Sequence, residues 1–431
     1  MAQKSFRWRL IRAGSLTFVL ALALALATGS VALAAEKVTI TFWHAMGGPL
    51  GDSLNDLVAA FNATHPDIEV KSQYQGNYGA LNQKILAAVA AKKPPTVAQV
   101  YSNWTDQLVE AGALAPMEDF IPGPGGLTDK EYKDIVPVFR SSNTFDGKFF
   151  TMPFNKSLYV MFYNVDALRD KELKPPANWK QLLEVAKALT VEKDGKITRY
   201  GFALRPNGDY FALFFFPNGG KWLSDDGKKA AFNSKAGVEA LQFMVDLVHK
   251  YKVAYYIPGY LDQDFAAGKT AIYFTSTPGR PYAEKAVAGK FKVGIAPIPY
   301  SKSKSTPVAG TDLAIFAAAS KAEQTAGWEF VKFLTNTENT AKFSIASYYL
   351  PVRQSAIESD RMKKYFAGDP YNKVGVNQLP YAVFDPPKAA WNKIRNYISD
   401  AVEKALLLKA TPKEALDEAV AKANQELARS R

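Results

Sequence analysis

Strand-like and helix-like segments alternate over residues 38–101, and this alternation constrains the fold more than any other feature. The segments are, in order, the extended run VTITFWH, the helical run LGDSLNDLVAAF, the extended run IEVKSQYQG, the helical run YGALNQKILAAVAA and the extended run TVAQVYS. Side chains that alternate with period two indicate strands, and apolar residues three or four apart indicate helices. A strand–helix–strand alternation predicts a parallel sheet with right-handed crossovers, so we expect an α/β fold.

The residues that follow these strands predict one wall of a ligand cleft. Ligands of open α/β sheets gather at the carboxyl ends of the strands. These ends carry Trp43 and His44, residues 76–78 and residues 101–104, and no G-x-G-x-x-G or Walker sequence that would indicate a nucleotide. Trp43 and His44 are therefore candidate ligand-binding residues. The alternative is that Trp43 fills the core of its own lobe.

The length of the chain and its later extended runs predict two lobes. A chain of 431 residues is too long for one hydrophobic core. Extended runs around Pro153, near residue 305 and at YYLPVR are expected to cross between the lobes. We therefore expect an N-terminal lobe of residues 36–154 plus 305–348 and a C-terminal lobe of residues 155–304 plus 349–431. Each lobe is expected to hold a mainly parallel sheet flanked by helices.

The first 35 residues predict a signal peptide that is cleaved on export to the periplasm. A basic head with four Lys and Arg residues precedes the apolar run SLTFVLALALALATG and the small-x-small sequence of residues 32–34. The alternative is an uncleaved anchor, because residues 14–35 are about long enough to span a bilayer. The chain contains no cysteine, which excludes a lipoprotein anchor, a disulfide and a Cys-ligated zinc site.

Charge and histidine content argue for a small-molecule binder. The formal net charge of +12 includes the four basic residues of the leader. The sequence contains no run of Lys and Arg interleaved with aromatic residues, so a nucleic acid is not expected as a partner. His44, His65 and His249 are the only histidines, and they are scattered, so a metal triad or a Ser/His/Asp set is not expected. A secreted hydrolase with paired carboxylates is the distant alternative. We expect no cofactor, no metal and no catalysis.

Seven stretches of the sequence carry a resemblance to a known family. They are FWHAMGGPLG, LVAAFNATHPDIEV, YQGNY, PPTVAQVY, MPFNKSLYVMFYN, YYLPVR and TPKEALDEAVAKANQEL. In these the chain resembles the extracellular solute-binding proteins of ABC importers, the group that includes maltose-type sugar binders, and within it most the glycerol-3-phosphate binders. The resemblance implies two α/β lobes, joined by three crossing segments, that close on a ligand and dock on a membrane permease as a monomer.

The resemblance also implies a set of ligand contacts. Carried over position by position, they are Tyr78 of GNY, Ser102 after QVY, Ser157 after PFNK, Ser276 or Thr277 at the end of YFTST, Gly310, Tyr349 of YLP, and Arg395. These residue types suit a phosphate ester, because Arg395 can present a guanidinium fork to phosphate oxygens and Gly310 lets backbone N–H groups approach. Hydroxyls and phenols supply further donors.

Two departures from the family pattern widen the range of expected ligands. Ser102 replaces the family's acidic residue, and LRPNGDYF replaces its tryptophan-rich segment. A roomier site favours a glycerophosphodiester over glycerol-3-phosphate itself. A neutral sugar or oligosaccharide is the alternative ligand, for which Asp209 and Asp312 are candidate polar contacts, together with the aromatic residues Trp43, Trp104, Tyr255 and Tyr256.

Overall fold

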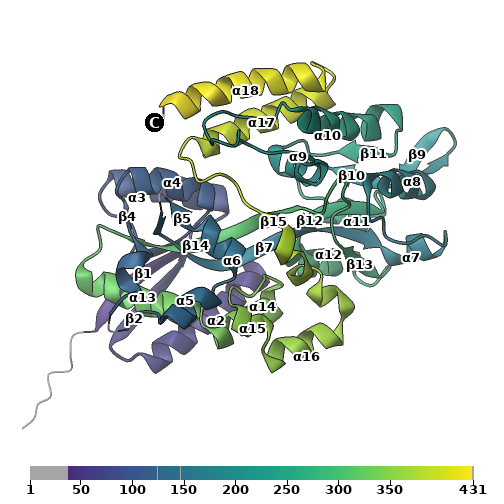
Figure 1. Ribbon diagram of the computed structural model, residues 1–431. Helices are drawn as coiled ribbons and strands as arrows, with labels where there is room; N and C mark the ends of the chain where they lie inside the picture. The colour runs from purple at the N-terminus through teal and green to yellow at the C-terminus, as the bar shows by residue number, and fades with distance from the viewer. Residues whose placement is uncertain (1–36, 124, 146, 430–431) are drawn as a thin grey trace, which may run out of the picture.

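The molecule consists of two α/β lobes joined by long strands (Figure 1). The computed structural model describes residues 37–123, 125–145 and 147–429. The predicted signal peptide, residues 1–35, lies outside the described residues. Within the described ranges, no helix is both long enough and apolar enough to cross a bilayer.

The first lobe is built from the predicted strand–helix alternation, which is confirmed. Its parallel strands are β1 (Val38–His44), β2 (Ile68–Tyr74) and β3 (Val97–Val100), and its crossover helices are α2 (Gly48–Thr64) and α3 (Tyr78–Ala90). β1 lies between β2 and β3 and pairs with both in parallel register. Phe42 and Phe61 each meet the ring of Phe330 edge-on, at 5.2 and 5.1 Å, in the core of this lobe.

Two long antiparallel strands, β7 (Met152–Asn164) and β14 (Thr306–Phe316), run from one lobe into the other. The strand order is β11-β10-β12-β7-β14-β3-β1-β2, so β14 continues the first sheet and β7 continues the second. A third segment runs beside them, because the N–H of Leu350 donates to the carbonyl of Lys156 at 2.7 Å. These three segments occupy the positions at which crossings were predicted.

The second lobe holds the other half of the sheet, in which parallel and antiparallel pairs are mixed. Its strands are β10 (Phe202–Leu204), β11 (Ala254–Tyr256) and β12 (Ile272–Ser276), with β13 (Val293–Ala296) antiparallel to β7. Its main helices are α8 (Trp179–Leu189), α9 (Gly208–Phe215), α10 (Lys235–Val245), α17 (Trp391–Leu406) and α18 (Pro412–Arg429). The rings of Phe215, Trp222 and Trp391 pack together under these helices. A sheet that continues through both lobes, with flanking helices in each, establishes the predicted two-lobed α/β fold.

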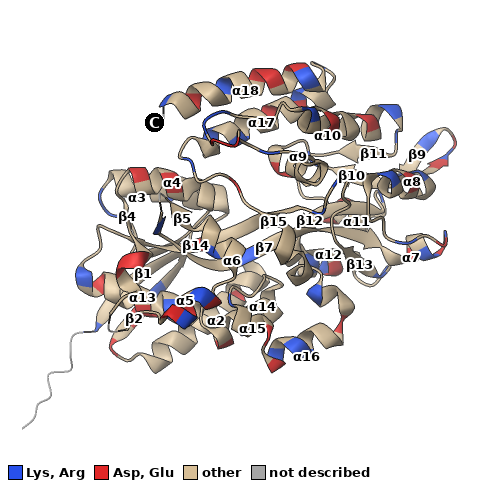
Figure 2. Ribbon diagram, in the orientation of Figure 1, with Lys and Arg blue, Asp and Glu red and all other residues tan. Residues whose placement is uncertain are grey.

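The remaining elements complete both lobes. In the first they are α4 (Ser102–Glu110), β4 (Leu114–Ala115), α5 (Asp129–Asp134), α6 (Pro137–Ser142), β5 (Thr144–Phe145), β6 (Lys148–Phe149), α13 (Lys321–Leu334) and α14 (Thr337–Ser347). In the second they are α7 (Val165–Arg169), β8 (Val191–Lys193), β9 (Lys196–Arg199), α11 (Asp262–Ala266) and α12 (Arg280–Val287). β15 (Ala382–Val383) pairs with β14. Lys and Arg are interspersed with Asp and Glu on outer helices such as α5, α16 (Asp360–Gly368) and α18 (Figure 2).

The C-terminal part of the chain returns to the first lobe before it joins the second. α15 (Gln354–Ile357) and α16 (Asp360–Gly368) pack on α14, and Ala341, Ala356 and Met362 share one apolar cluster. α17 packs instead on α9 and α18. The prediction from the sequence assigns all of residues 349–431 to the C-terminal lobe. We propose that this lobe resumes only after α16.

Candidate ligand-binding site

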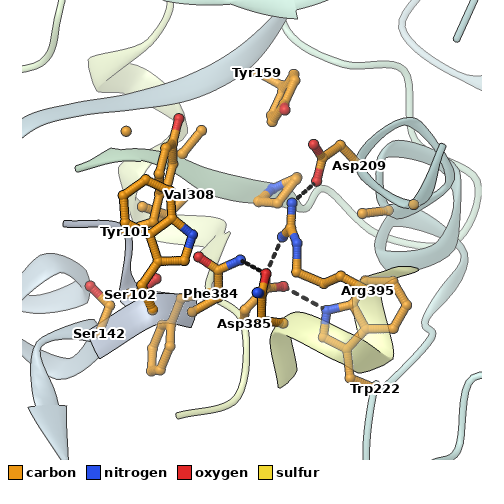
Figure 3. A pocket seen from close by; sticks show the side chains of 18 of the residues that line it. Tyr101, Ser102, Ser142, Tyr159, Asp209, Trp222, Val308, Phe384, Asp385 and Arg395 are labelled. Carbon is orange, nitrogen blue, oxygen red and sulfur yellow. Dashed lines mark hydrogen bonds and ion pairs between the residues drawn. The ribbon is translucent and has the colours of Figure 1, made fainter. Parts of the chain in front are cut away.

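A cavity of about 320 Å³ lies between the lobes and is the candidate site (Figure 3). The residues of the first lobe that line it are Tyr78, Tyr101, Ser102, Asn103, Trp104 and Ser142. Those of the second lobe are Tyr159, Asp209, Trp222, Asp385, Asn392 and Arg395. The crossing strands contribute Lys156 and Gly310. At one side of the cavity the lobes touch, because Asn103 Nδ2 donates to Asn392 Oδ1 at 3.4 Å.

Local structure explains why these side chains reach the cavity. Tyr78 begins α3, whose preceding residue Asn77 caps the helix by accepting the N–H of Ala80 at 3.0 Å. Ser102 begins α4, directly after β3. Asp209 lies in the first turn of α9, which Asn207 caps in the same way. The ends of parallel strands and the first turns of the following helices therefore converge on the cavity, as expected for an open α/β sheet.

Arg395 is held between two carboxylates. One terminal nitrogen of its guanidinium donates to Asp385 and the other to Asp209 (Figure 3). Trp222 Nε1 also donates to Asp385, at 3.0 Å. Burial lowers the pKa of Arg395, but Asp209 and Asp385 outweigh this and hold it above its ordinary value. This cluster of one cation and two carboxylates, here named the Arg395 cluster, carries a formal charge of −1.

Aromatic residues of the first lobe line another part of the cavity, and an amide and a further phenol lie behind them. The Tyr78 hydroxyl accepts from Asn155 Nδ2 at 3.1 Å and lies 3.4 Å from the Tyr349 hydroxyl. The Tyr101 ring meets Tyr78 edge-on at 4.9 Å and Trp104 at 5.2 Å. Burial raises the pKa of Tyr78 and of Tyr349. Both phenols are therefore neutral at pH 7 and remain available as hydrogen-bond donors.

The cavity brings together only some of the candidate residues. Tyr78, Ser102, Trp104, Asp209, Gly310 and Arg395 line it. Tyr349 lies behind Tyr78. Ser157 is buried within β7, Ser276 ends β12, and Thr277 faces a second, small cavity beside Arg280.

The remaining candidates lie outside the lining of the cavity. Trp43 Nε1 donates to Gln73 Oε1 at 2.7 Å within the first lobe. Asp312 is buried on β14, where it pairs with Lys156 at 2.8 Å. Sequence reasoning missed Lys156, Tyr159, Trp222 and Asp385. Of these, only Lys156 carried a signal, as the one charge in a long apolar strand.

His44 is enclosed by the first lobe. It is 3% exposed, lies 5.5 Å from the Phe42 ring and 5.9 Å from the Tyr74 ring, and accepts the N–H of Met46 at Nδ1, 3.3 Å away. Burial lowers the pKa of His44 to about 4. The imidazole is therefore neutral at pH 7, which suits a core position rather than an anion contact.

His44 is expected to make the protein sensitive to acid. Between pH 6.5 and about 4 the unfolded chain binds a proton at His44 that the folded chain does not bind, so the free energy of unfolding falls as the pH falls. The full loss is about 3 kcal/mol. His44→Asn keeps an acceptor near the position of Nδ1 for Met46 but does not titrate. Chemical denaturation at pH 7 and pH 4.5 is expected to show a smaller loss in this variant, and equal losses would contradict the assignment.

Comparisons with known proteins agree with this architecture. Residues 56–368 match the family model for the bacterial extracellular solute-binding protein. The sn-glycerol-3-phosphate-binding periplasmic protein UgpB of Escherichia coli K12 is 28% identical, over 94% of this chain and 96% of its own length.

Solved structures give the same architecture. UgpB from Mycobacterium tuberculosis in complex with glycerophosphocholine superimposes with a TM-score of 0.81 at 24% identity, covering 91% of this chain and 98% of that chain. The GacH receptor of Streptomyces glaucescens, solved unliganded and with acarbose, gives a TM-score of 0.80 at 23% identity, covering 92% and 100%. The family match spans well over half of the sequence, and the chain therefore belongs to the bacterial extracellular solute-binding protein family.

Proposed function

We propose that this chain is the periplasmic binding component of an ABC importer. It captures a glycerophosphodiester or a glycerol-3-phosphate-like ligand between its lobes and delivers it to a membrane permease. It acts as a monomer and without catalysis. The observation that carries the proposal is the polar cavity at the junction of the lobes, which Tyr78, Ser102, Gly310 and Arg395 line together.

The dimensions and chemistry of the cavity support a ligand of this class. A volume of about 320 Å³ falls at the lower end of the range for small-molecule sites, which leaves room for a diester as well as a monoester. Tyr78 and Ser102 supply hydroxyl donors. Arg395 keeps N–H donors beyond the two that its carboxylate partners engage. The relatives at 28% identity bind sn-glycerol-3-phosphate, which supports the same ligand class for this chain.

A neutral sugar is the second candidate, and the Arg395 cluster is the observation that favours it. Carboxylates paired with a guanidinium present planar acceptors and donors together, which suits the hydroxyls of a sugar. The rings of Tyr101, Trp104 and Tyr159 provide apolar faces in the same cavity. The two ligand classes differ in charge, so direct binding measurements separate them.

Calorimetry on the exported chain with glycerol-3-phosphate, glycerophosphocholine and maltose tests the proposal. We expect glycerophosphocholine to bind and to raise the melting temperature, because a ligand at a hundredfold excess over its Kd stabilises the folded state by about 2.7 kcal/mol. Small-angle scattering is expected to show a smaller radius of gyration with the bound ligand, as hinge closure requires. Binding of maltose alone would favour the sugar, and conversion of any ligand to product would contradict a pure binding role.

A further inference from the structure

Three exposed tyrosines lie just after strands whose carboxyl ends face the cleft. Six large apolar or aromatic side chains are exposed among the described residues, and three of them are Tyr74, Tyr260 and Tyr282, with exposed fractions of 58%, 75% and 42%. Tyr74 ends β2 in the first lobe. In the second lobe, Tyr260 follows β11, and Tyr282 lies in α12, the helix after β12. Ligands of open α/β sheets bind at this edge, so these three residues, here named the outer tyrosine cluster, are candidates for ligand contact.

The members of the outer tyrosine cluster are neighbours across the two lobes. Partial burial raises the pKa of Tyr282, and Tyr260, Tyr74 and Asp262 raise it further. Interactions between charges weaken with distance, so these groups lie near one another. The Tyr74 side chain also lies against the loop after β1, because a Cβ atom at Gly47 would lie 3.1 Å from the Tyr74 hydroxyl. Rings from both lobes therefore gather at one side of the cleft.

The outer tyrosine cluster borders the interlobe cavity. Burial raises the pKa of Tyr101 and of Tyr159, two residues that line the cavity, and Tyr260 adds to the shift of both. Burial also raises the pKa of Tyr349, and Tyr282 adds to that shift. The cluster itself is not part of the cavity lining. A ligand that fills the cavity and extends beyond it can therefore reach these rings.

A cation already lies on one ring of the cluster. Arg205, the residue after β10, has its guanidinium carbon 5.1 Å from the centroid of the Tyr260 ring. Its Nη2 donates to the carbonyl of Pro258 at 3.4 Å, which ties Arg205 to the loop that carries Tyr260. Most of the Tyr260 side chain remains exposed despite this contact. The rest of the ring is therefore free for a second group, and its π face attracts cations.

A carboxylate next to the cluster balances the charge of Arg205. Asp262 is half-buried and lies two residues after Tyr260, and it forms no ion pair with any of the described residues. Burial raises the pKa of Asp262, and Arg205 opposes this shift. The patch is thus formally neutral, with a carboxylate that lacks a direct counter-ion. Aromatic faces beside a carboxylate suit a quaternary ammonium group.

We propose that the outer tyrosine cluster and Asp262 form a second subsite, which binds the quaternary ammonium end of a glycerophosphodiester while Arg395 binds its phosphate. This inference rests on the proposed function, since it requires a phosphate ester in the cavity. The subsite selects such a diester over glycerol-3-phosphate, because the monoester has no second alcohol to fill it.

Variants of the exposed tyrosines test the subsite by calorimetry with glycerophosphocholine and glycerol-3-phosphate. Tyr74→Ala and Tyr260→Ala are each expected to lower the affinity for glycerophosphocholine about 2- to 30-fold. Both are expected to leave the affinity for glycerol-3-phosphate unchanged. Tyr260→Phe keeps the ring and is expected to keep both affinities, whereas Asp262→Asn is expected to weaken the diester alone.

Tyr251→Ala is the matched control. Its ring also lies beside a cation, with Lys187 Nζ 4.9 Å from the centroid, but it does not line the interlobe cavity. We expect both affinities to stay unchanged in this variant. A selective loss of glycerophosphocholine binding here would show that the effect is not specific to the outer tyrosine cluster, and would overturn the inference.

The outcomes separate this inference from the proposed function. If the parent protein binds neither phosphate ester, the proposed function fails and the subsite fails with it. If the parent binds and the tyrosine variants keep its affinity for the diester, or lose both esters equally, only the subsite is wrong. The neutral dimethylbutyl diester, in which carbon replaces the nitrogen of choline, supplies a test without mutation. Weaker binding of this diester than of glycerophosphocholine supports a cation site, and equal binding contradicts it.

Discussion

Replacing Gly310 by alanine is expected to lower the free energy of unfolding by roughly 2–6 kcal/mol. Gly310 has a φ of +90°, a conformation that residues with a side chain rarely adopt, and a Cβ atom there would lie 2.0 Å from the carbonyl oxygen of Asn155. That oxygen belongs to the backbone of β7, which pairs with β14 at this position, so it cannot move aside easily. Backbone strain and steric overlap therefore add.

Gly48→Ala provides the matched control for this variant. Gly48 also has a positive φ, of +56°, but a Cβ there meets nothing within 4 Å. The Gly48→Ala substitution is therefore expected to lower the free energy of unfolding only by the backbone strain, about 1 kcal/mol. Urea denaturation of both variants measures the difference, which isolates the steric contribution at the strand crossing. Equal losses in the two variants would show that β7 and β14 adjust at Gly310 without cost.

Local patterns in the sequence were sufficient for the framework of the fold. The strand–helix alternation of the first lobe depends on side-chain periods of 2 and 3.6, which are local properties, and it was predicted correctly. The same pattern explains His44, which lies two residues after Phe42 and four after Ile40 on the buried face of β1. The period-two pattern of the strand therefore indicated a core position for His44, whereas its place at the end of the strand suggested a ligand contact.

The partners of the charged residues were beyond the reach of local patterns. Asp385 meets Trp222 across 163 positions of the chain, and Lys156 meets Asp312 across 156. No spacing rule connects residues that far apart, because the tertiary fold alone brings them together. The sequence pointed to Arg395 as an anion contact and to Asp209 as a polar contact, without indicating that Asp209 and Asp385 both pair with Arg395. The charge balance of the cavity could therefore be determined only from the structure.

Arg395→Met is expected to weaken the binding of glycerol-3-phosphate by about 1.5–3 kcal/mol, the usual cost of losing a hydrogen bond from a charged donor. The substitution removes the N–H donors at one end of the cavity. It also leaves the carboxylates of Asp209 and Asp385 facing each other without the cation that lies between them. Both effects act against the ligand. Calorimetry at low and moderate salt measures the loss.

Arg395→Met/Asp209→Asn/Asp385→Asn separates the two effects. The amides keep the shape of the carboxylates but remove their mutual repulsion, so an affinity that stays low shows that Arg395 itself contacts the ligand. Recovery of the parent affinity would show that Arg395 only neutralises its neighbours, and the assignment of Arg395 to the ligand site would then be wrong.

Arg280→Met is the control outside the cavity for both Arg395 variants. Arg280 is held in the same way by Asp369 at 2.5 Å and Glu284 at 2.7 Å, beside the second, small cavity. Its side chain is only 10% exposed, so its loss removes a largely buried cation together with both ion pairs, and it is expected to lower the stability of the fold. The affinity for ligand is expected to stay unchanged, since no part of Arg280 lines the interlobe cavity. A parallel fall in affinity in this control would mean that the Arg395 variants report on folding rather than on the site.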